Sequence, residues 1–430
     1  MNTAISRDDC LALDQADPLR ALRSFFDLPK QSQPTIYLDG NSLGALPKAT
    51  PKAVAQVITQ EWGQDLIQSW NKAGWFNMPQ RLGDQLAPLI GAGHGEVVMT
   101  DTTSVNLYKV LCAAAELAQQ RHPEKRVLLS ETSNFPTDLY IAQSVCNQYQ
   151  LRLVLVDASA VKEALTADVA LVMLTHVNYR TGAMYEMAEI TELAHRVGAL
   201  TVWDLAHSAG AVPVDLREAN ADYAVGCGYK YLNGGPGAPA FVWANSQVLG
   251  TTTQPLSGWW GHVRPFAFDT SYEPKPGIDQ YLCGTQSILA LTAMRCGLDI
   301  FDHAKTLGGM TAIRKKSLAL TDLFMALCAS RCAAFGLQNV TPTDPRYRGS
   351  HVSLAAANDG YAMMQALIAR GVIGDFRRGD AAGEPDLLRF GFTPLYTRFV
   401  DVWDAVQQLV EMLQNAEWKR PEFNREQVVT

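Results

Sequence analysis

The segment ADYAVGCGYKYLNGGPG, residues 221–237, is the most informative part of the chain. A short apolar run, Tyr223–Gly226, is followed by Lys230 and then by a glycine-rich turn. Lys230 lies between two tyrosines and close to small residues that allow a ligand to approach. A lysine that loses solvation favours its neutral amine, which is a nucleophile toward an aldehyde. We therefore predict that Lys230 forms a Schiff base with a cofactor, against the alternative of a solvated lysine at a strand end.

Apolar runs of strand length alternate with helical runs before this segment. The candidate strands are residues 96–100, 126–130, 151–156, 169–175, 199–203 and 223–226. The candidate helices are residues 105–119, 135–148 and 187–196. This alternation predicts an α/β fold with a mostly parallel sheet. The run AFVWA, which follows the turn-forming residues 234–239, predicts one further strand, antiparallel to its neighbours.

Length and composition limit the class of protein. A chain of 430 residues with 47% apolar residues predicts two domains, one large and one small. The net charge of −7 gives no electrostatic attraction to nucleic acid or to anionic membranes. No segment has the length and apolar character of a signal peptide or a membrane span. The absence of GxGxxG and of a phosphate-binding P-loop sequence disfavours a dinucleotide or nucleoside triphosphate enzyme.

The eight cysteines are scattered and include no CxxC pair. Cys328 and Cys332 lie four residues apart in an apolar helical stretch, where packed thiols are the better interpretation. We predict a reducing, cytoplasmic location and no structural metal.

A second motif, TVWDLAH at residues 201–207, ends an apolar strand at Asp204. A carboxylate there can face a protonated pyridine nitrogen and keep such a ring electron-withdrawing. A helix-capping aspartate is the alternative, which loses weight because a candidate Schiff-base lysine follows. For His207, a cofactor contact and a packed core histidine are about equally supported.

A third motif follows the strand EVVMT, where Asp101 and Thr102 lead into Thr103 and Ser104 before a helix expected to begin near Val105. A helix N-terminus offers free N–H groups and a favourable dipole to a phosphate, and the two hydroxyl groups add donors. Simple N-capping explains the same residues when they are taken alone. The order of phosphate motif, aspartate and lysine along the chain favours the phosphate site.

Together these segments resemble the kynureninase family, within the class V aminotransferase-like group of fold type I enzymes. The resemblance runs from about Tyr37 to about Phe399. YLDGNSLG at residues 37–44 is similar to the substrate-loop motif, and NFPTD at residues 134–138 is similar to the cofactor motif. The resemblance implies a large domain with a mostly parallel, mixed sheet covered by helices, plus a smaller C-terminal α+β domain. Residues 1–50 would complete the small domain and carry the substrate loop, 51–304 would form the large domain, and 305–430 the small one.

The family's cofactor is pyridoxal 5′-phosphate (PLP). The resemblance implies that Lys230, Tyr229 and Asp204 are catalytic, that Phe135 stacks on the pyridine ring, and that Asp138 lies close to that ring. Phe135 also follows a strand in a proline-containing turn, where an exposed ring can cover a planar ligand. The implied cofactor-binding set is Thr103, Ser104, Phe135, Pro136, Thr137, Asp138, Thr175, Asp204, His207, Tyr229, Lys230, Trp259 and Thr285.

The implied substrate-binding residues are Ser42, Trp70 and Arg389. Arg389 lies between two apolar residues in LLRFGFTPLY and offers a bidentate fork to a carboxylate, although a surface arginine is the simpler alternative. Trp70 and Trp75 lie in SWNKAGWF, and one of them is expected to contact the substrate's aryl ring unless both pack in the core. This tryptophan-rich pattern resembles bacterial members of the family, which favours kynurenine over its 3-hydroxy form.

The implied reaction is hydrolysis of the Cβ–Cγ bond of L-kynurenine to anthranilate and L-alanine. Tryptophan catabolism is the expected pathway, and NAD biosynthesis is the alternative. The implied partner is a second copy of the chain, in a homodimer where Trp259 and Thr285 complete the neighbour's phosphate pocket. Two alternatives stay open: a cysteine desulfurase or selenocysteine lyase, which needs a mobile cysteine, and a cofactor-binding regulator without catalysis.

Overall fold

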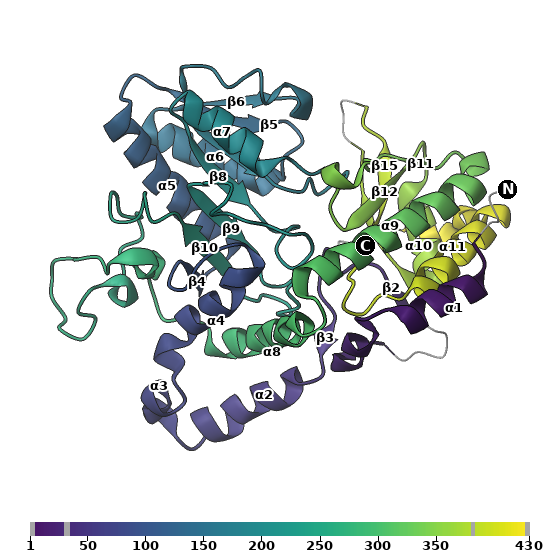
Figure 1. Cartoon of the computed structure of the whole chain (residues 1–430), viewed down its shortest axis with the longest axis horizontal. Helices are drawn as coiled ribbons and strands as arrows, with labels where there is room; N and C mark the ends of the chain where they lie inside the picture. The colour runs from purple at the N-terminus through teal and green to yellow at the C-terminus, as the bar shows by residue number, and fades with distance from the viewer. Residues whose placement is uncertain (1–4, 30–34, 380–382, 426–430) are drawn as a thin grey trace. The chain divides into compact units, whose positions relative to one another are not determined.

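The computed structural model describes residues 5–29, 35–379 and 383–425. The chain divides into two compact units (Figure 1). The large unit comprises residues 49–179 and 185–298, and the small unit comprises residues 1–48, 180–184 and 299–430. The three-part division predicted from the sequence assigns the short segment 180–184 to the large domain, and that division stays a prediction.

A seven-stranded sheet forms the centre of the large unit, in the order β4-β10-β9-β8-β7-β5-β6. Its strands are β4 (Val97–Thr100), β5 (Val127–Glu131), β6 (Arg152–Val156), β7 (Val169–Thr175), β8 (Leu200–Asp204), β9 (Tyr223–Gly226) and β10 (Ala240–Ala244). The pairs β5–β6, β5–β7, β7–β8 and β8–β9 are parallel, whereas β10 is antiparallel to both β9 and β4. The mostly parallel sheet and its one antiparallel strand, both predicted from the sequence, are confirmed.

Helices cover both faces of this sheet. The helices of the large unit are α2 (Thr50–Gln56), α3 (Ser69–Lys72), α4 (Met78–Leu86), α5 (Thr103–Arg121), α6 (Pro136–Tyr149) and α7 (Met187–Arg196). Helix α8 (Ile288–Lys305) begins in the large unit and ends in the small one. In β8, Val202 joins the apolar cluster that contains α5, while the Trp203 indole donates to Thr191 of α7 at 3.4 Å. Because successive strand residues point to opposite faces, α5 and α7 lie on opposite sides. This double cover explains why β7 is buried at every residue.

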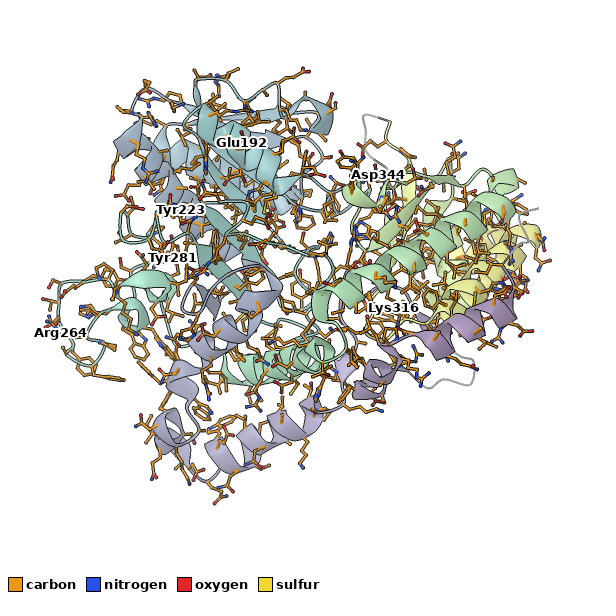
Figure 2. The ribbon with its side chains drawn as sticks, viewed as in Figure 1. Glu192, Tyr223, Arg264, Tyr281, Lys316 and Asp344 are labelled. Atoms are coloured by element: carbon orange, nitrogen blue, oxygen red, sulfur yellow. The ribbon has the colours of Figure 1, made fainter. Side chains whose placement is uncertain are left out.

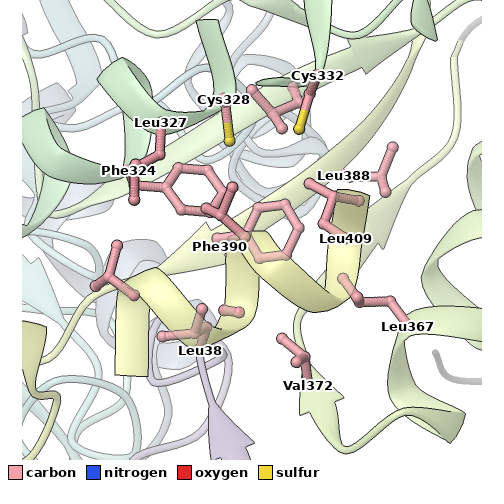
Figure 3. Close-up of a cluster of buried hydrophobic side chains, with 14 of the residues drawn as sticks. Leu38, Phe324, Leu327, Cys328, Cys332, Leu367, Val372, Leu388, Phe390 and Leu409 are labelled. Carbon is pink, nitrogen blue, oxygen red and sulfur yellow. The ribbon is translucent and has the colours of Figure 1, made fainter. Parts of the chain in front are cut away.

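The small unit has a four-stranded antiparallel sheet in the order β11-β12-β15-β14. The strands are β11 (Gln338–Asn339), β12 (His351–Ala356), β14 (Asp375–Arg377) and β15 (Asp386–Gly391), with helices α1 (Arg7–Ala16), α9 (Gly309–Arg331), α10 (Gly360–Ala369) and α11 (Phe399–Gln414). Two short pairs complete the unit: β1 (Phe26–Asp27) with β3 (Leu46–Pro47), and β2 (Ile36–Tyr37) with β13 (Val372–Ile373). The core gathers Phe324 and Cys328 of α9 and Cys332, the residue that caps its C-terminus, with Phe390 of β15 (Figure 3). The two thiols are therefore packed in the core, as predicted.

The N-terminal segment is an integral part of the small unit. Leu38 packs in the same core as α9 and β15. Lys316 of α9, labelled in Figure 2, forms a buried ion pair with Asp17 at 2.7 Å and donates to the carbonyl oxygen of Pro394 at 2.7 Å. Among the helices that the structure describes, none combines the length and the apolar character required to cross a bilayer.

Candidate active site

The predicted site residues of the large unit follow the carboxyl ends of its strands. Strands β4, β5, β7, β8 and β9 run in the same direction, since the strand between β4 and β9 is antiparallel to both. Their carboxyl ends therefore lie at one edge of the sheet, where ligands bind in open α/β folds. Loops that are far apart in the sequence meet at this edge.

One pocket at this edge collects most of the predicted cofactor-binding residues. It is lined by Thr103, Ser104, Phe135, Thr137, Asp138, Thr175, Tyr179, Asp204, Ala206, His207, Tyr229 and Lys230. Sequence reasoning missed Tyr179 and Ala206. Ala206 lies inside the motif TVWDLAH, so its position was the available signal. Tyr179 lies in the loop after β7, and nothing in the local sequence distinguished it from other tyrosines.

Lys230 lies in a tight turn after β9. A Cβ atom on Gly228 would come within 2.4 Å of the Pro239 carbonyl oxygen and 2.7 Å of the Met294 sulfur, so the turn requires glycine there. The Lys230 Nζ atom lies 3.0 Å from His207 Nε2, and 5.7 Å from the centre of the Tyr229 ring. Burial raises the pKa of Tyr229, so its hydroxyl group stays protonated and can donate a hydrogen bond.

Two buried carboxylates lie beside the lysine. Thr175 Oγ1 lies 3.5 Å from both Asp138 Oδ2 and Asp204 Oδ2, and the Ala206 amide donates to Asp204 Oδ1 at 2.9 Å. Burial raises the pKa of Asp138 well above its usual value, and the charge of Asp204 raises it further. Burial also raises the pKa of Asp204, but the charge of Lys230 and the Ala206 amide oppose that shift. We infer that Asp138 holds a proton and that Asp204 holds the negative charge.

The start of α5 supplies anion-binding donors. The helix begins at Thr103, two residues earlier than predicted, because Thr102 is the N-cap and accepts from the Val105 amide at 3.3 Å. Thr103 and Ser104 therefore occupy the first turn, where amide groups have no partner within the helix. These amides, the two hydroxyl groups and the helix dipole suit a phosphate group.

Phe135 forms an aromatic wall of the pocket. It precedes α6 and is 41% exposed, which is unusual for a large apolar residue beside a buried sheet edge. Its ring meets that of Tyr179 edge to face, with the ring centres 5.2 Å apart. Asn134 Oδ1 accepts from the Phe135 amide at 2.7 Å and from Thr175 Oγ1 at 2.5 Å, which ties this loop to β7.

Several predicted residues do not line this pocket. Pro136 is the first residue of α6, and Thr285 is exposed. Trp259 is 39% exposed and contacts the rings of Trp260 and Phe266. Trp70 packs edge to face against Trp75 and Trp260 in the same aromatic group.

The remaining predicted residues belong to the small unit. Arg389 of β15 is buried, and its Nη2 atom donates to Ser42 Oγ at 3.0 Å. Asp375 of β14 forms an ion pair with Arg389 and accepts from Ser42 Oγ at 3.1 Å. The structure therefore brings Ser42 and Arg389 together and adds Asp375, which sequence reasoning missed. Arg389 is not a surface arginine.

Comparisons with known proteins agree on the fold and the family. A family model described as the kynureninase C-terminal domain matches residues 313–409. A kynureninase of Burkholderia pseudomallei is 56% identical over 99% of this chain and 100% of its own length. Among solved structures, a cysteine desulfurase of Escherichia coli has a TM-score of 0.76 at 18% identity, covering 93% of this chain and 98% of its own. A variant of C-DES with glycine covalently linked to its PLP cofactor has a TM-score of 0.72 at 17% identity, covering 89% of this chain and 100% of its own.

The sheet order, the two units and the lysine-bearing pocket define the class as fold type I, the architecture of PLP-dependent enzymes related to the cysteine desulfurases. Within that class, full-length identity of 56% shows that the chain belongs to the kynureninase family.

Proposed function

We propose that this protein is a PLP-dependent hydrolase that cleaves the Cβ–Cγ bond of L-kynurenine, giving anthranilate and L-alanine in tryptophan catabolism. The observation that carries this proposal is the 56% identity, over essentially the full length of both chains, to a protein named kynureninase. The pocket at the carboxyl edge of the large unit supplies the residues that such chemistry requires.

The lining of the pocket fits PLP, group by group. Lys230 would hold the cofactor covalently, and Thr103 and Ser104 at the start of α5 would bind its phosphate. Phe135 would cover one face of the ring, and the anionic Asp204 would face the pyridine nitrogen. Bound in this way, the cofactor withdraws electrons from the substrate's Cα and supplies the chemistry of bond cleavage.

The chain's own residues would move and hold protons. The Lys230 amine would be the base that accepts the substrate's Cα proton at Nζ. His207 Nε2, at 3.0 Å, holds Nζ in the pocket through a hydrogen bond. Tyr229, protonated because burial raises the pKa of its hydroxyl group, would donate to the phosphate. By the family resemblance, Arg389 and Ser42 would bind the substrate's α-carboxylate, and Trp70 would contact its aryl ring.

The cysteines disfavour the desulfurase alternative. All eight lie in the described part of the chain, seven of them buried and Cys283 partly buried. Cys283, the partly buried one, donates from its Sγ to Asp101 Oδ2 at 3.7 Å. A desulfurase needs a mobile, reactive thiol, and the seven buried cysteines do not fit that requirement.

A direct assay tests the activity. The purified protein loaded with PLP should release fluorescent anthranilate from L-kynurenine and should release no sulfide from L-cysteine. The expected selectivity between the two substrates exceeds about a hundredfold, because a site built to bind a polar aryl ketone rejects a substrate that lacks it. Sulfide release that matches or exceeds anthranilate release would overturn the proposal in favour of the desulfurase.

We further propose that two copies of the chain form a homodimer with shared active sites. Trp259 and Thr285 lie outside the pocket of their own chain, and Trp259 is exposed in an aromatic group. Arg264, five residues after Trp259, lies on a loop that projects from the large unit (Figure 2), and Phe266 on this loop is 67% exposed. Exposed aromatic residues of this kind are typical of interfaces. Trp259 and Thr285 would complete the phosphate pocket of the partner subunit.

Complementation between two inactive variants tests the shared site. Lys230→Ala and Trp259→Ala proteins are mixed and allowed to exchange subunits. In a two-fold dimer with shared sites, one site of each mixed dimer collects both defects and the other collects neither. Random exchange makes about half of the dimers mixed, so roughly a quarter of all sites should regain activity. Absence of recovered activity, with exchange verified by mass spectrometry, would place Trp259 outside the partner's site.

The cytoplasmic location, the preference for kynurenine over 3-hydroxykynurenine and the absence of a nucleic-acid partner stay predictions.

A further inference from the structure

Glu131 is a fully buried carboxylate at the same sheet edge as the pocket, but it does not line the pocket. It is the last residue of β5. A buried carboxylate is costly unless several donors satisfy it, so its partners indicate what it holds in place.

Two partners of Glu131, Tyr185 and Asn178, come from the loop after β7. The Tyr185 hydroxyl group donates to Glu131 Oε2, and Asn178 Nδ2 donates to Oε1 at 3.3 Å. Asn178 Nδ2 also lies 2.9 Å from Ser133 Oγ and 3.1 Å from the Ser133 carbonyl oxygen. Burial raises the pKa of Glu131, while the donors Tyr185, Asn178 and Ser133 lower it. The carboxylate thus ties the loop after β5 to the loop after β7.

These two loops carry the aromatic wall of the pocket. Phe135 lies two residues after Ser133, and Tyr179 directly follows Asn178. Their rings meet edge to face at 88°, a geometry that a small shift of either loop would break. Two links therefore join these loops: Thr175 Oγ1 donates to Asn134 Oδ1, and Asn178 Nδ2 donates to Glu131 Oε1.

We propose that Glu131 is a positioning residue that fixes the ring of Phe135 over the cofactor through Asn178 and Ser133. This inference rests on the proposed function, because it takes the pocket to bind PLP and Phe135 to cover the PLP ring. On this proposal Glu131 acts on the cofactor through the ring of Phe135, so its contribution should disappear when that ring is removed.

A double-mutant cycle on the PLP-loaded protein tests this dependence. Glu131→Gln keeps the shape of the side chain but removes its charge, and it should raise the dissociation constant of PLP about tenfold. Phe135→Ala should raise it by a similar factor. The dissociation constant of PLP in the double variant should stay within about twofold of that in Phe135→Ala, because Glu131 has no effect once the ring that it positions is gone. The visible circular dichroism of bound PLP should change in Glu131→Gln, since the ring's surroundings change.

A matched control separates positioning from general destabilisation. Asp222 is a buried carboxylate at the amino end of β9, which accepts from the Thr201 amide at 2.8 Å and from His195 Nε2 at 2.8 Å. Asp222→Asn should lower the melting temperature while leaving the affinity and circular dichroism of PLP unchanged. Tyr185→Phe, which removes one donor and keeps the ring, should reproduce the Glu131→Gln effect to a smaller extent.

The outcomes are distinguishable from a failure of the proposed function. A wild-type protein that binds no PLP or cleaves no L-kynurenine would overturn the function itself. If the wild-type protein does both, the positioning role would be overturned by a double variant in which the Glu131→Gln and Phe135→Ala increases in the PLP dissociation constant multiply. Equal losses of PLP affinity in Glu131→Gln and Asp222→Asn would also overturn the positioning role, since they would show only that each substitution destabilises the large unit.

Discussion

Replacing Lys230 with alanine is expected to abolish the hydrolysis of L-kynurenine, with kcat falling by at least about a thousandfold. The side chain would serve twice, as the covalent anchor of the cofactor and as the base for the Cα proton. Positioned acid–base groups alone contribute roughly a hundred- to ten-thousandfold in rate. Loss of the anchor adds to that, because the cofactor would be held by non-covalent contacts only.

The measurement combines kinetics with chemical mapping. Borohydride reduction of the wild-type protein followed by peptide mapping should place the cofactor on Lys230, and the Lys230→Ala protein should give no reduced adduct. The matched control is Lys125, a buried lysine of the same unit that donates to the carbonyl oxygens of Ala167 and Val169 at 2.8 and 3.2 Å. Lys125→Gln should lower stability but retain the adduct and kcat. An adduct on another lysine in the wild-type protein would refute the assignment.

The large unit was predictable from the sequence because its signals are local. The apolar run of β7 is buried at every position and is bounded by polar residues, so its bounds were predicted correctly. The bounds of β9, β10 and α7 agree as well. The start of α5 was misplaced by two residues, because Thr102 and Ser104 are both good N-caps and local sequence does not choose between them.

The smaller C-terminal α+β domain was expected, but its short strands and part of the site were not predictable, because they depend on long-range contacts. Strand β14 has three residues, two of them charged, and no alternation marks it as a strand. Its residue Asp375 reaches Arg389 and Ser42 only after β14 and β15 pair and the N-terminal segment packs on them. Glu131 ends a strand, where an exposed carboxylate is the usual expectation, and its burial depends on a tyrosine from another loop.

The charged member of the buried carboxylate pair can be identified by matched substitutions. Asp204→Asn should lower kcat by about a hundredfold or more while KM changes little, because a neutral amide no longer stabilises a proton on the pyridine nitrogen. Asp138→Asn should lower kcat far less, within about tenfold, because we infer that Asp138 is already neutral. Burial and the charge of Asp204 raise the pKa of Asp138 well above its usual value. Both variants keep the shape of the side chain, and both residues lie at the same distance, 3.5 Å, from Thr175 Oγ1. Steady-state kinetics with L-kynurenine at saturating PLP would measure both effects. Equal losses in the two variants would show that the charge is shared, and a larger loss in Asp138→Asn would reverse the assignment.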